Sequence, residues 1–151
     1  PDIRSFKSEV AECKAVTAWI LDRAKDGLAQ HELGVFVRSD AQIPRAVAAV
    51  TAAGIPFNVL DEHVETTNGQ ASVCTMHLAK GLEFRAVVVM ACDDEVIPLQ
   101  ERVEAVTDEA DIEEVYNTER NLLYVACTRA RDRLLVTSAD PASESLEDLK
   151  R

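Results

Sequence analysis

One apolar run restricts the possible folds of this chain more than any other feature. The sequence AVVVMA at residues 86–91 is apolar at every position, so a strand formed there is apolar on both faces. Such a strand needs protein on each side, as in the centre of a parallel sheet covered by helices on both faces. GVFV at residues 34–37 has the same character. Together the two runs predict an α/β fold.

Helical periodicity supplies the covering layers. Apolar residues recur at three- and four-residue steps between residues 6 and 28, which predicts a long amphipathic helix ending near Gly27. A second such face spans residues 43–53, with Pro44 in its first turn and Gly54 as its stop. The chain therefore alternates helices and strands from its beginning.

The remaining segments continue this alternation. We expect strands at residues 57–60, 72–75 and 133–137, a helix at residues 112–130, a short acidic helix after residue 141, and loops at residues 61–70 and 93–111. This order predicts an α/β sandwich with a mostly parallel sheet.

Net charge is a weak guide to partners here. A net charge of −11 would by itself argue against nucleic acid. However, residues 93–114 hold ten carboxylates and one cation, Arg102, whereas four arginines follow between residues 120 and 133. A chain with charges separated in this way can still present a local cationic site.

Several classes of protein are disfavoured. No apolar run is long enough to span a membrane, no signal peptide is visible, and the four cysteines lack metal-ligand spacing, so we expect free buried thiols in a reducing compartment. There is no GxxxxGK[ST] phosphate loop and no GxSxG motif. The sequence begins at Pro1 rather than Met, so we expect it to be part of a longer protein.

The segment VCTMHLAKGLEF at residues 73–84 is polar beyond the needs of packing. A buried strand leads into Thr75, His77, Lys80 and Glu83, and open α/β sheets bind ligands beyond the carboxyl ends of strands. A surface turn with a helix cap is an equally open alternative.

A second candidate is NTERNLLYVACTRARDR at residues 117–133. Arg120 and Arg129 lie nine residues apart on the predicted helix, where we expect them near the same side. Arg129 stands near the end of that helix, and a guanidinium suits a phosphate because it stays charged and bonds bidentately. In the competing interpretation, Arg129 and Arg131 offset the helix dipole or pair with surface acids.

A third candidate is Arg38-Ser39-Asp40, at the end of the GVFV strand. Backbone amides at a helix start could hold a phosphate there. Asp40 works against an anion but suits a cap, so an ordinary helix cap is the favoured interpretation.

Two of these segments resemble known motifs. TMHLAKGLEFRAVVV, residues 75–89, resembles motif V of the UvrD/Rep/PcrA helicases of superfamily 1, and ERNLLYVACTRARDRLLV, residues 119–136, resembles their motif VI. VRSDAQIPRAV, residues 37–47, and GIPFNVL, residues 54–60, resemble segments upstream of motif V. The motifs occur in the right order, separated by an acidic stretch that contains a proline, and the resemblance extends over residues 6–137.

The resemblance implies the C-terminal RecA-like domain, called 2A, across residues 1–151. The implied fold is a three-layer α/β sandwich that lacks its own phosphate loop. In such helicases two RecA-like domains clamp ATP; the first supplies the phosphate loop and Mg²⁺, and the second supplies an arginine finger. The implied partners are single-stranded DNA and the N-terminal RecA-like domain of the same protein, in bacterial cytoplasm, with no membrane.

The resemblance also assigns roles to single residues. Arg129 falls at the motif VI arginine that contacts the γ-phosphate, Glu83 at the position that contacts the ATP ribose, and Gly81 beside it in the nucleotide-binding motif. Lys80, Arg120 and Tyr124 also fit the motifs, with a purely structural role left open for each.

A separate group is implied for DNA. Thr75 and His77 match motif V positions near single-stranded DNA, and Arg38 falls at a contact to the DNA backbone. Asp40 departs from the family's usual Asn, which puts a phosphate contact there in doubt.

Two further departures bear on function. The large 2B insertion common in the family is absent, since only residues 61–74 separate GIPFNVL from motif V, and the motif IV arginine is not in this chain. We therefore keep two alternatives to a motor half open: a helicase-like module that binds protein or DNA without motor activity, and the helicase part of a nuclease–helicase complex.

Overall fold

The computed structural model describes residues 2–63 and 69–150. Within them six parallel strands form one sheet in the order β1-β6-β5-β2-β4-β3. The strands are β1 (Asp2–Phe6), β2 (Leu33–Val37), β3 (Phe57–Val59), β4 (Ala71–Thr75), β5 (Phe84–Val89) and β6 (Ala130–Ala139). The predicted α/β fold is confirmed. Residues 64–68, inside the predicted loop at 61–70, lie outside the described part of the chain.

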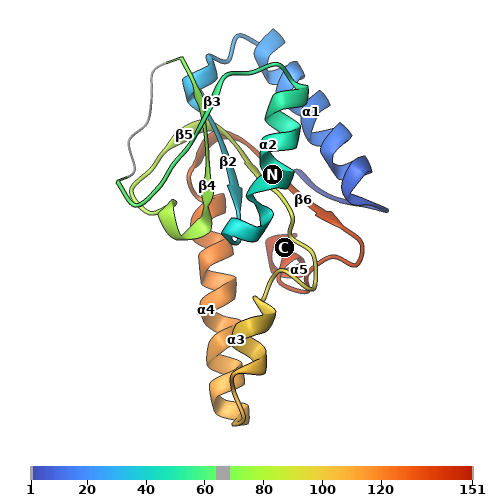
Figure 1. Ribbon diagram of the computed structural model, residues 1–151, viewed down its shortest axis with the longest axis vertical. Helices are drawn as coiled ribbons and strands as arrows, with labels where there is room; N and C mark the ends of the chain where they lie inside the picture. The colour runs from blue at the N-terminus through green and yellow to red at the C-terminus, as the bar shows by residue number, and fades with distance from the viewer. Residues whose placement is uncertain (1, 64–68, 151) are drawn as a thin grey trace.

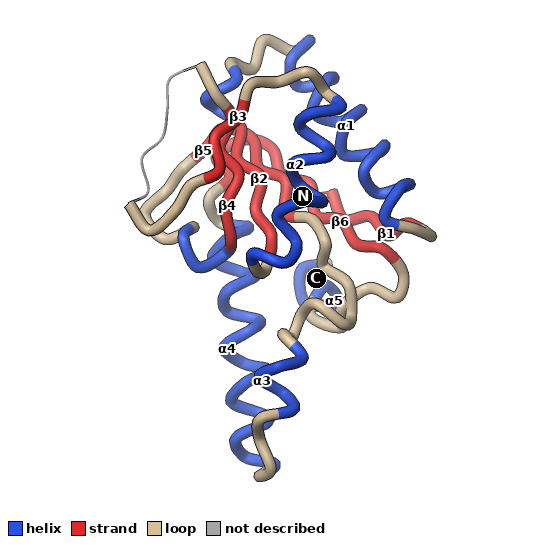
Figure 2. Tube along the Cα trace, in the orientation of Figure 1, coloured by secondary structure: helices blue, strands red, loops and turns tan. Residues whose placement is uncertain are grey.

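Helices cover both faces of this sheet (Figures 1 and 2). α1 (Glu9–Lys25) and α2 (Ile43–Ala52) pack on one face, and α4 (Glu109–Cys127) and α5 (Leu146–Leu149) pack on the other. The short elements are α3 (Gln100–Glu104) and three 3-10 turns, η1 (Gln30–Glu32), η2 (Asp40–Gln42) and η3 (Met76–Leu78). None of the helices described is both long enough and apolar enough to cross a bilayer.

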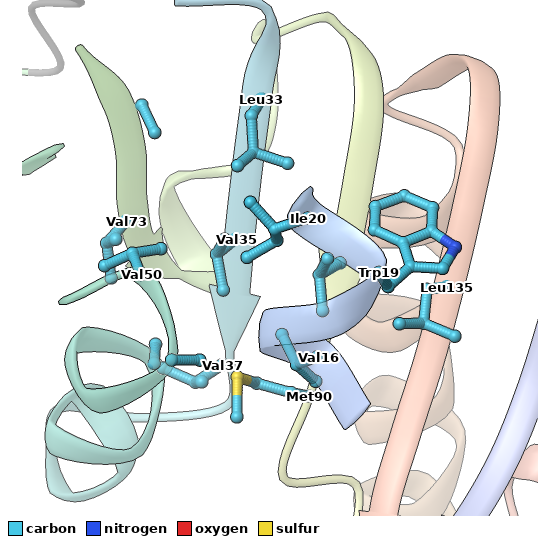
Figure 3. Close-up of a cluster of buried hydrophobic side chains, with 14 of the residues drawn as sticks. Val16, Trp19, Ile20, Leu33, Val35, Val37, Val50, Val73, Met90 and Leu135 are labelled. Atoms are coloured by element: carbon cyan, nitrogen blue, oxygen red, sulfur yellow. The ribbon is translucent and has the colours of Figure 1, made fainter. Parts of the chain in front are cut away.

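The packing of the central strand β5 explains why its residues 86–89 are all apolar. Ala86 and Val88 belong to the core under α1 and α2, whereas Val87 and Val89 belong to the core under α4. Alternate side chains of a strand point to opposite faces, so both cores need apolar residues from β5. Figure 3 shows the core under α1 and α2, in which apolar side chains of α1 pack over β2 and β6.

Three of the four free cysteines are buried, as expected, and Cys13 is half-buried. Burial raises the pKa of the Cys74 and Cys127 thiols to about 12 and that of Cys92 well above its usual value.

Two elements were absent from the prediction. β1 is a half-exposed edge strand, polar enough (DIRSF) to leave no apolar pattern, and α1 begins after it with Ser8 as its cap. The acidic stretch 93–111 is not all loop, because α3 lies within it and α4 already begins at Glu109, capped by Asp108. Acidic residues favour the first turn of a helix, so an acidic run there is compatible with helix.

The two ends of the parallel strands define two surfaces of the molecule. We call the side where the strands end, at Val37, Thr75 and Val89, the carboxyl edge, and the side where β5 and β6 begin, at Phe84 and Ala130, the amino edge. α3 and the first half of α4 project beyond the carboxyl edge (Figure 1). This projection holds most of the acidic stretch, so much of the negative charge lies away from the amino edge.

Candidate functional site at the two edges of the sheet

The end of α4 and the start of β5 meet at the amino edge. The backbone N–H of Phe84 donates to the carbonyl oxygen of Arg129 at 2.9 Å, which brings the GLEF segment beside the end of motif VI. Gly81 lies in the turn before it with φ +85°, a conformation that glycine adopts without strain. Glu83 is exposed, and its Oε1 lies 3.6 Å from Nε of Arg131. Two distant segments of sequence thus form one surface.

Arg129 is held there by neutral groups. Its Nε donates to the carbonyl of Val125 at 3.2 Å, its Nη1 to the carbonyl of Leu82 at 3.4 Å, and its Nη2 to Oγ1 of Thr128 at 3.2 Å. The side chain is half-buried. The contact with Val125 satisfies a carbonyl of the last helical turn, so Arg129 does support the helix end, but none of these acceptors neutralises its charge.

The other arginines differ from Arg129. Among residues 2–63 and 69–150, every other arginine has a carboxylate within 4.0 Å: Arg4, Arg23, Arg38, Arg45, Arg85, Arg102, Arg120, Arg131 and Arg133. The surface ion pair considered for Arg129 and Arg131 is therefore present for Arg131 alone. In that part of the chain, Arg129 is the arginine without a carboxylate partner, so its charge is available to an anion that is not part of the chain.

The expectation that Arg120 and Arg129 share one side of the helix is wrong. Nine residues at about 100° each amount to two and a half turns, which puts the two on opposite sides. Arg120 accordingly pairs with Asp148 of α5 at 2.8 Å, whereas Arg129 turns towards Leu82. Arg120 is a surface ion-pair residue.

The carboxyl edge holds the group implied for DNA. Arg38 follows β2, and its side chain is 2% exposed. Its Nε and Nη2 donate to the two carboxylate oxygens of Glu119 at 2.8 and 2.7 Å, and its Nη1 lies 3.2 Å from Nε2 of His77. The direct contact to a DNA phosphate expected for Arg38 does not fit this geometry, because the guanidinium is buried and its charge is neutralised by Glu119.

His77 is the exposed end of this arrangement. A guanidinium has no acceptor, so Nε2 of His77 is the acceptor in its contact with Arg38, and Nδ1 is the ring nitrogen left to donate. Thr75 is half-buried at the end of β4, two residues before His77. The structure thus brings Thr75, His77 and Arg38 together and places them on the opposite edge from Glu83 and Arg129.

The segment at residues 73–84 is consequently divided between two surfaces. The expectation of one polar cluster beyond the carboxyl end of a strand holds for Thr75 and His77, but the chain then returns along the sheet to start β5 at the amino edge. Ser39 occupies the cap position of η2 without a side-chain capping hydrogen bond, so the favoured interpretation of residues 38–40 as an ordinary helix cap is not supported either.

Glu119 was missed by the sequence analysis. It is fully buried on α4 and accepts two further hydrogen bonds, from the Leu99 backbone N–H at 2.6 Å and from Nη1 of Arg102 at 2.7 Å. Burial alone would raise the pKa of its carboxyl, but the donors outweigh it and hold the pKa below its ordinary value. The available signal was its position four residues before Leu123 on the apolar face of the helix.

A second network of ion pairs lies at the carboxyl edge. Arg45 donates to Glu12, which is fully buried, and to Asp93 at 2.7 Å; Glu12 also accepts from the Ala91 backbone and from Thr137. The gap between β2 and β5 is the switch point where open α/β sheets bind ligands, because their connections leave in opposite directions. Here Arg45 of α2 donates to Asp93, which follows β5, and to Glu12 of α1. In the described residues, no three His, Cys, Asp or Glu side chains are grouped to hold a metal ion.

Comparison with known proteins decides the family. The profile of the UvrD-like helicase C-terminal domain matches residues 61–140. The chain belongs to this family. The match includes both GLEF and the TRA segment, and thus both contributors to the amino edge of this UvrD-like domain.

Relatives and a solved structure agree with that assignment. ATP-dependent DNA helicase PcrA of Staphylococcus epidermidis (strain ATCC 35984) is 38% identical over 78 residues, and that of Staphylococcus aureus (strain MRSA252) is equally similar. The match covers 52% of the UvrD-like chain and only 10% of either relative. The C-terminal domain of a possible DNA helicase from Lactobacillus plantarum WCFS1 has the same fold, with a TM-score of 0.69 at 23% identity, covering 97% of this chain and 78% of that one.

Proposed function

We propose that this chain is the C-terminal motor half of an ATP-dependent DNA helicase or translocase. In this proposal residues 1–151 are one RecA-like domain without a 2B insertion, and Arg129 is the arginine finger for an ATP bound against the N-terminal RecA-like domain. The observation that carries the proposal is the unneutralised guanidinium of Arg129, held in place at the amino edge by carbonyl and hydroxyl groups.

The chemistry of phosphoryl transfer explains why such a group is useful. Negative charge is spread over the γ-phosphoryl oxygens in the transition state, and a pre-positioned cation stabilises it. An arginine already paired with a carboxylate would have to give up that partner first. Among the described residues, Arg129 has neutral partners to exchange for phosphate oxygens.

Glu83 and Gly81 complete this half of the nucleotide site. The exposed carboxylate of Glu83 can accept hydrogen bonds from the ribose hydroxyls of ATP, and Gly81 has no side chain to hold the nucleotide away from the backbone. Arg129 as a donor and Glu83 as an acceptor fit one side of a nucleotide. The Mg²⁺ that accompanies ATP is assigned to the N-terminal domain, together with the phosphate loop.

Single-stranded DNA is assigned to the carboxyl edge, at Thr75 and His77. The Nδ1–H of His77 can donate to a phosphate or base acceptor, and Arg38 fixes the ring rather than touching DNA. The relatives are named as ATP-dependent DNA helicases, which supports DNA as the polymer and bacterial cytoplasm as the location.

The test uses the longer protein that carries this chain. It should hydrolyse ATP faster with single-stranded DNA than without, whereas the isolated chain should not hydrolyse ATP, because only one face of the nucleotide site is present. Turnover by the purified chain at the rate of the longer protein would refute the shared-site proposal.

A non-motor binding module is the second candidate, supported by the acidic projection of α3 and α4. The two candidates differ in what precedes this chain. A GxxxxGK[ST] loop, an Asp-Glu pair and a QNYRS-like string upstream would support the motor; their absence would support the module.

A further inference from the structure

The buried pair of Arg38 and Glu119 is more elaborate than packing requires. Moving two charges out of water carries a desolvation penalty, and apolar residues of similar volume often stabilise a protein equally well. Here the pair is bidentate, and both partners have further contacts: Arg38 with His77, and Glu119 with the Leu99 backbone and Arg102. These contacts connect the ends of β2 and β4 to α3 and α4.

The pair lies at the carboxyl edge, on the helix that leads to the amino edge. On one side Arg38 holds the exposed imidazole of His77 at the carboxyl edge. On the other side Glu119 belongs to α4, which continues as an unbroken helix to Cys127, two residues before Arg129. The sequence of α4 contains no glycine or proline. The eight helical steps from Glu119 to Cys127 span about 12 Å, so a displacement of Glu119 along the axis moves the helix end that holds Arg129.

We infer that the Arg38–Glu119 pair couples the occupancy of the His77 surface by single-stranded DNA to the position of Arg129. This inference rests on the proposed function. DNA that displaces or tightens His77 acts on the Nη1 of Arg38; the bidentate bonds pass the movement to Glu119, and α4 carries it to the amino edge. Arg38 and Glu119 are positioning residues, since neither touches nucleotide or DNA in this scheme.

The experiment measures ATP hydrolysis by the longer protein with and without a saturating thymidine oligonucleotide. Glu119→Gln keeps an acceptor for the Leu99 N–H but removes the charge that holds the guanidinium. We expect the stimulation by DNA to fall about tenfold, a usual size for coupling between sites. The rate without DNA and the dissociation constant for the oligonucleotide should change less than twofold, which a general loss of structure would not produce.

Arg120→Ala is the matched control. Arg120 is the next residue of the same helix, with an exposed ion pair to Asp148, and its loss should leave the stimulation unchanged. If Glu119→Gln does not fold, the double variant Arg38→Met with Glu119→Gln removes both buried charges together, and it should fold with the same loss of stimulation.

The outcomes separate the two proposals. Full stimulation in a folded Glu119→Gln or double variant overturns the coupling and leaves the proposed function intact. A wild-type protein whose ATP hydrolysis ignores DNA overturns the proposed function, and the coupling with it.

Discussion

Arg38 and Arg129 occupy the two edges of one sheet and show two ways of holding a guanidinium. Arg38 is buried at the carboxyl edge and bound to both oxygens of a carboxylate. Arg129 is half-buried at the amino edge and, within the part of the chain that the structure describes, is bound to neutral oxygens. The first arrangement satisfies the charge within the fold. The second fixes its direction without neutralising it.

The difference shows that partners, rather than residue type or motif position, indicate a role. Arg129 falls in a segment that resembles helicase motif VI, Arg38 falls in one that resembles helicase sequence upstream of motif V, and both are candidates for a phosphate contact. A guanidinium paired with a buried carboxylate has little attraction left for an anion, because the two charges cancel at short range. Only Arg129 keeps the property that an arginine finger requires.

The largest effect is expected for Arg129→Ala in the longer protein. We expect kcat for ATP to fall by about 10³–10⁵-fold, the usual effect of losing an arginine finger, with ATP binding largely retained. Steady-state kinetics and equilibrium binding of a fluorescent ATP analogue measure the two effects. Arg133→Ala, an exposed arginine paired with Asp26, is the control. Unchanged turnover in Arg129→Ala would refute the finger.

Arg38→Ala should affect stability instead. Removing one partner of a buried ion pair costs about 3–5 kcal/mol in the free energy of unfolding, here because Glu119 keeps its charge in the interior with only Leu99 N–H and Arg102 as donors. Urea denaturation followed by circular dichroism gives the value. Arg120→Ala, which breaks an exposed pair, should lose no more than about 1 kcal/mol. Equal losses in the two variants would contradict the distinction.

Glu83→Ala tests the ribose contact that is proposed at the amino edge. Losing a hydrogen bond between a carboxylate and the ribose should raise KM for ATP about tenfold, with a smaller change in kcat. Wild-type protein with 2′,3′-dideoxy-ATP should show a similar rise, and combining the two changes should add little. Arg131→Ala breaks the 3.6 Å contact to Glu83 without removing the carboxylate, so its KM should stay close to wild type. A KM that Glu83→Ala leaves unchanged would remove the ribose contact from the proposal.

The smallest expected effect is on pH dependence. The folded protein holds the pKa of Glu119 below its unfolded value, so this group adds stability above the unfolded pKa and loses it as pH falls through the folded one. Below about pH 5, wild-type stability should therefore decline more steeply than that of Glu119→Gln. Urea midpoints at several pH values give both curves, and subtraction removes other carboxyls with lowered pKa, such as Asp2 and Glu32. Parallel curves would contradict the assignment.

Much of the fold could be predicted because its signals are local. Residues 86–89 and 34–37 are apolar at every position and lie in the adjacent strands β5 and β2, whereas Met90 and Ala91 of the predicted run lie just beyond β5. Pro44 and Gly54 mark the two ends of α2 as expected, with Gly54 at φ +71°. β1 could not be found in this way, because an edge strand hydrogen-bonds to one neighbour and needs no apolar pattern.

The sequence by itself determined the α/β class, the family motifs and the position of Arg129 at a helix end. Only the tertiary structure decided which charges are neutralised, because Glu119 lies 81 residues from Arg38 along the chain and no local pattern joins them. The tertiary structure likewise decided that Thr75 and His77 lie at the carboxyl edge while Glu83 lies at the amino edge. Periodicity describes the environment of one segment, whereas the partner of a charge depends on which distant segments the sheet brings together.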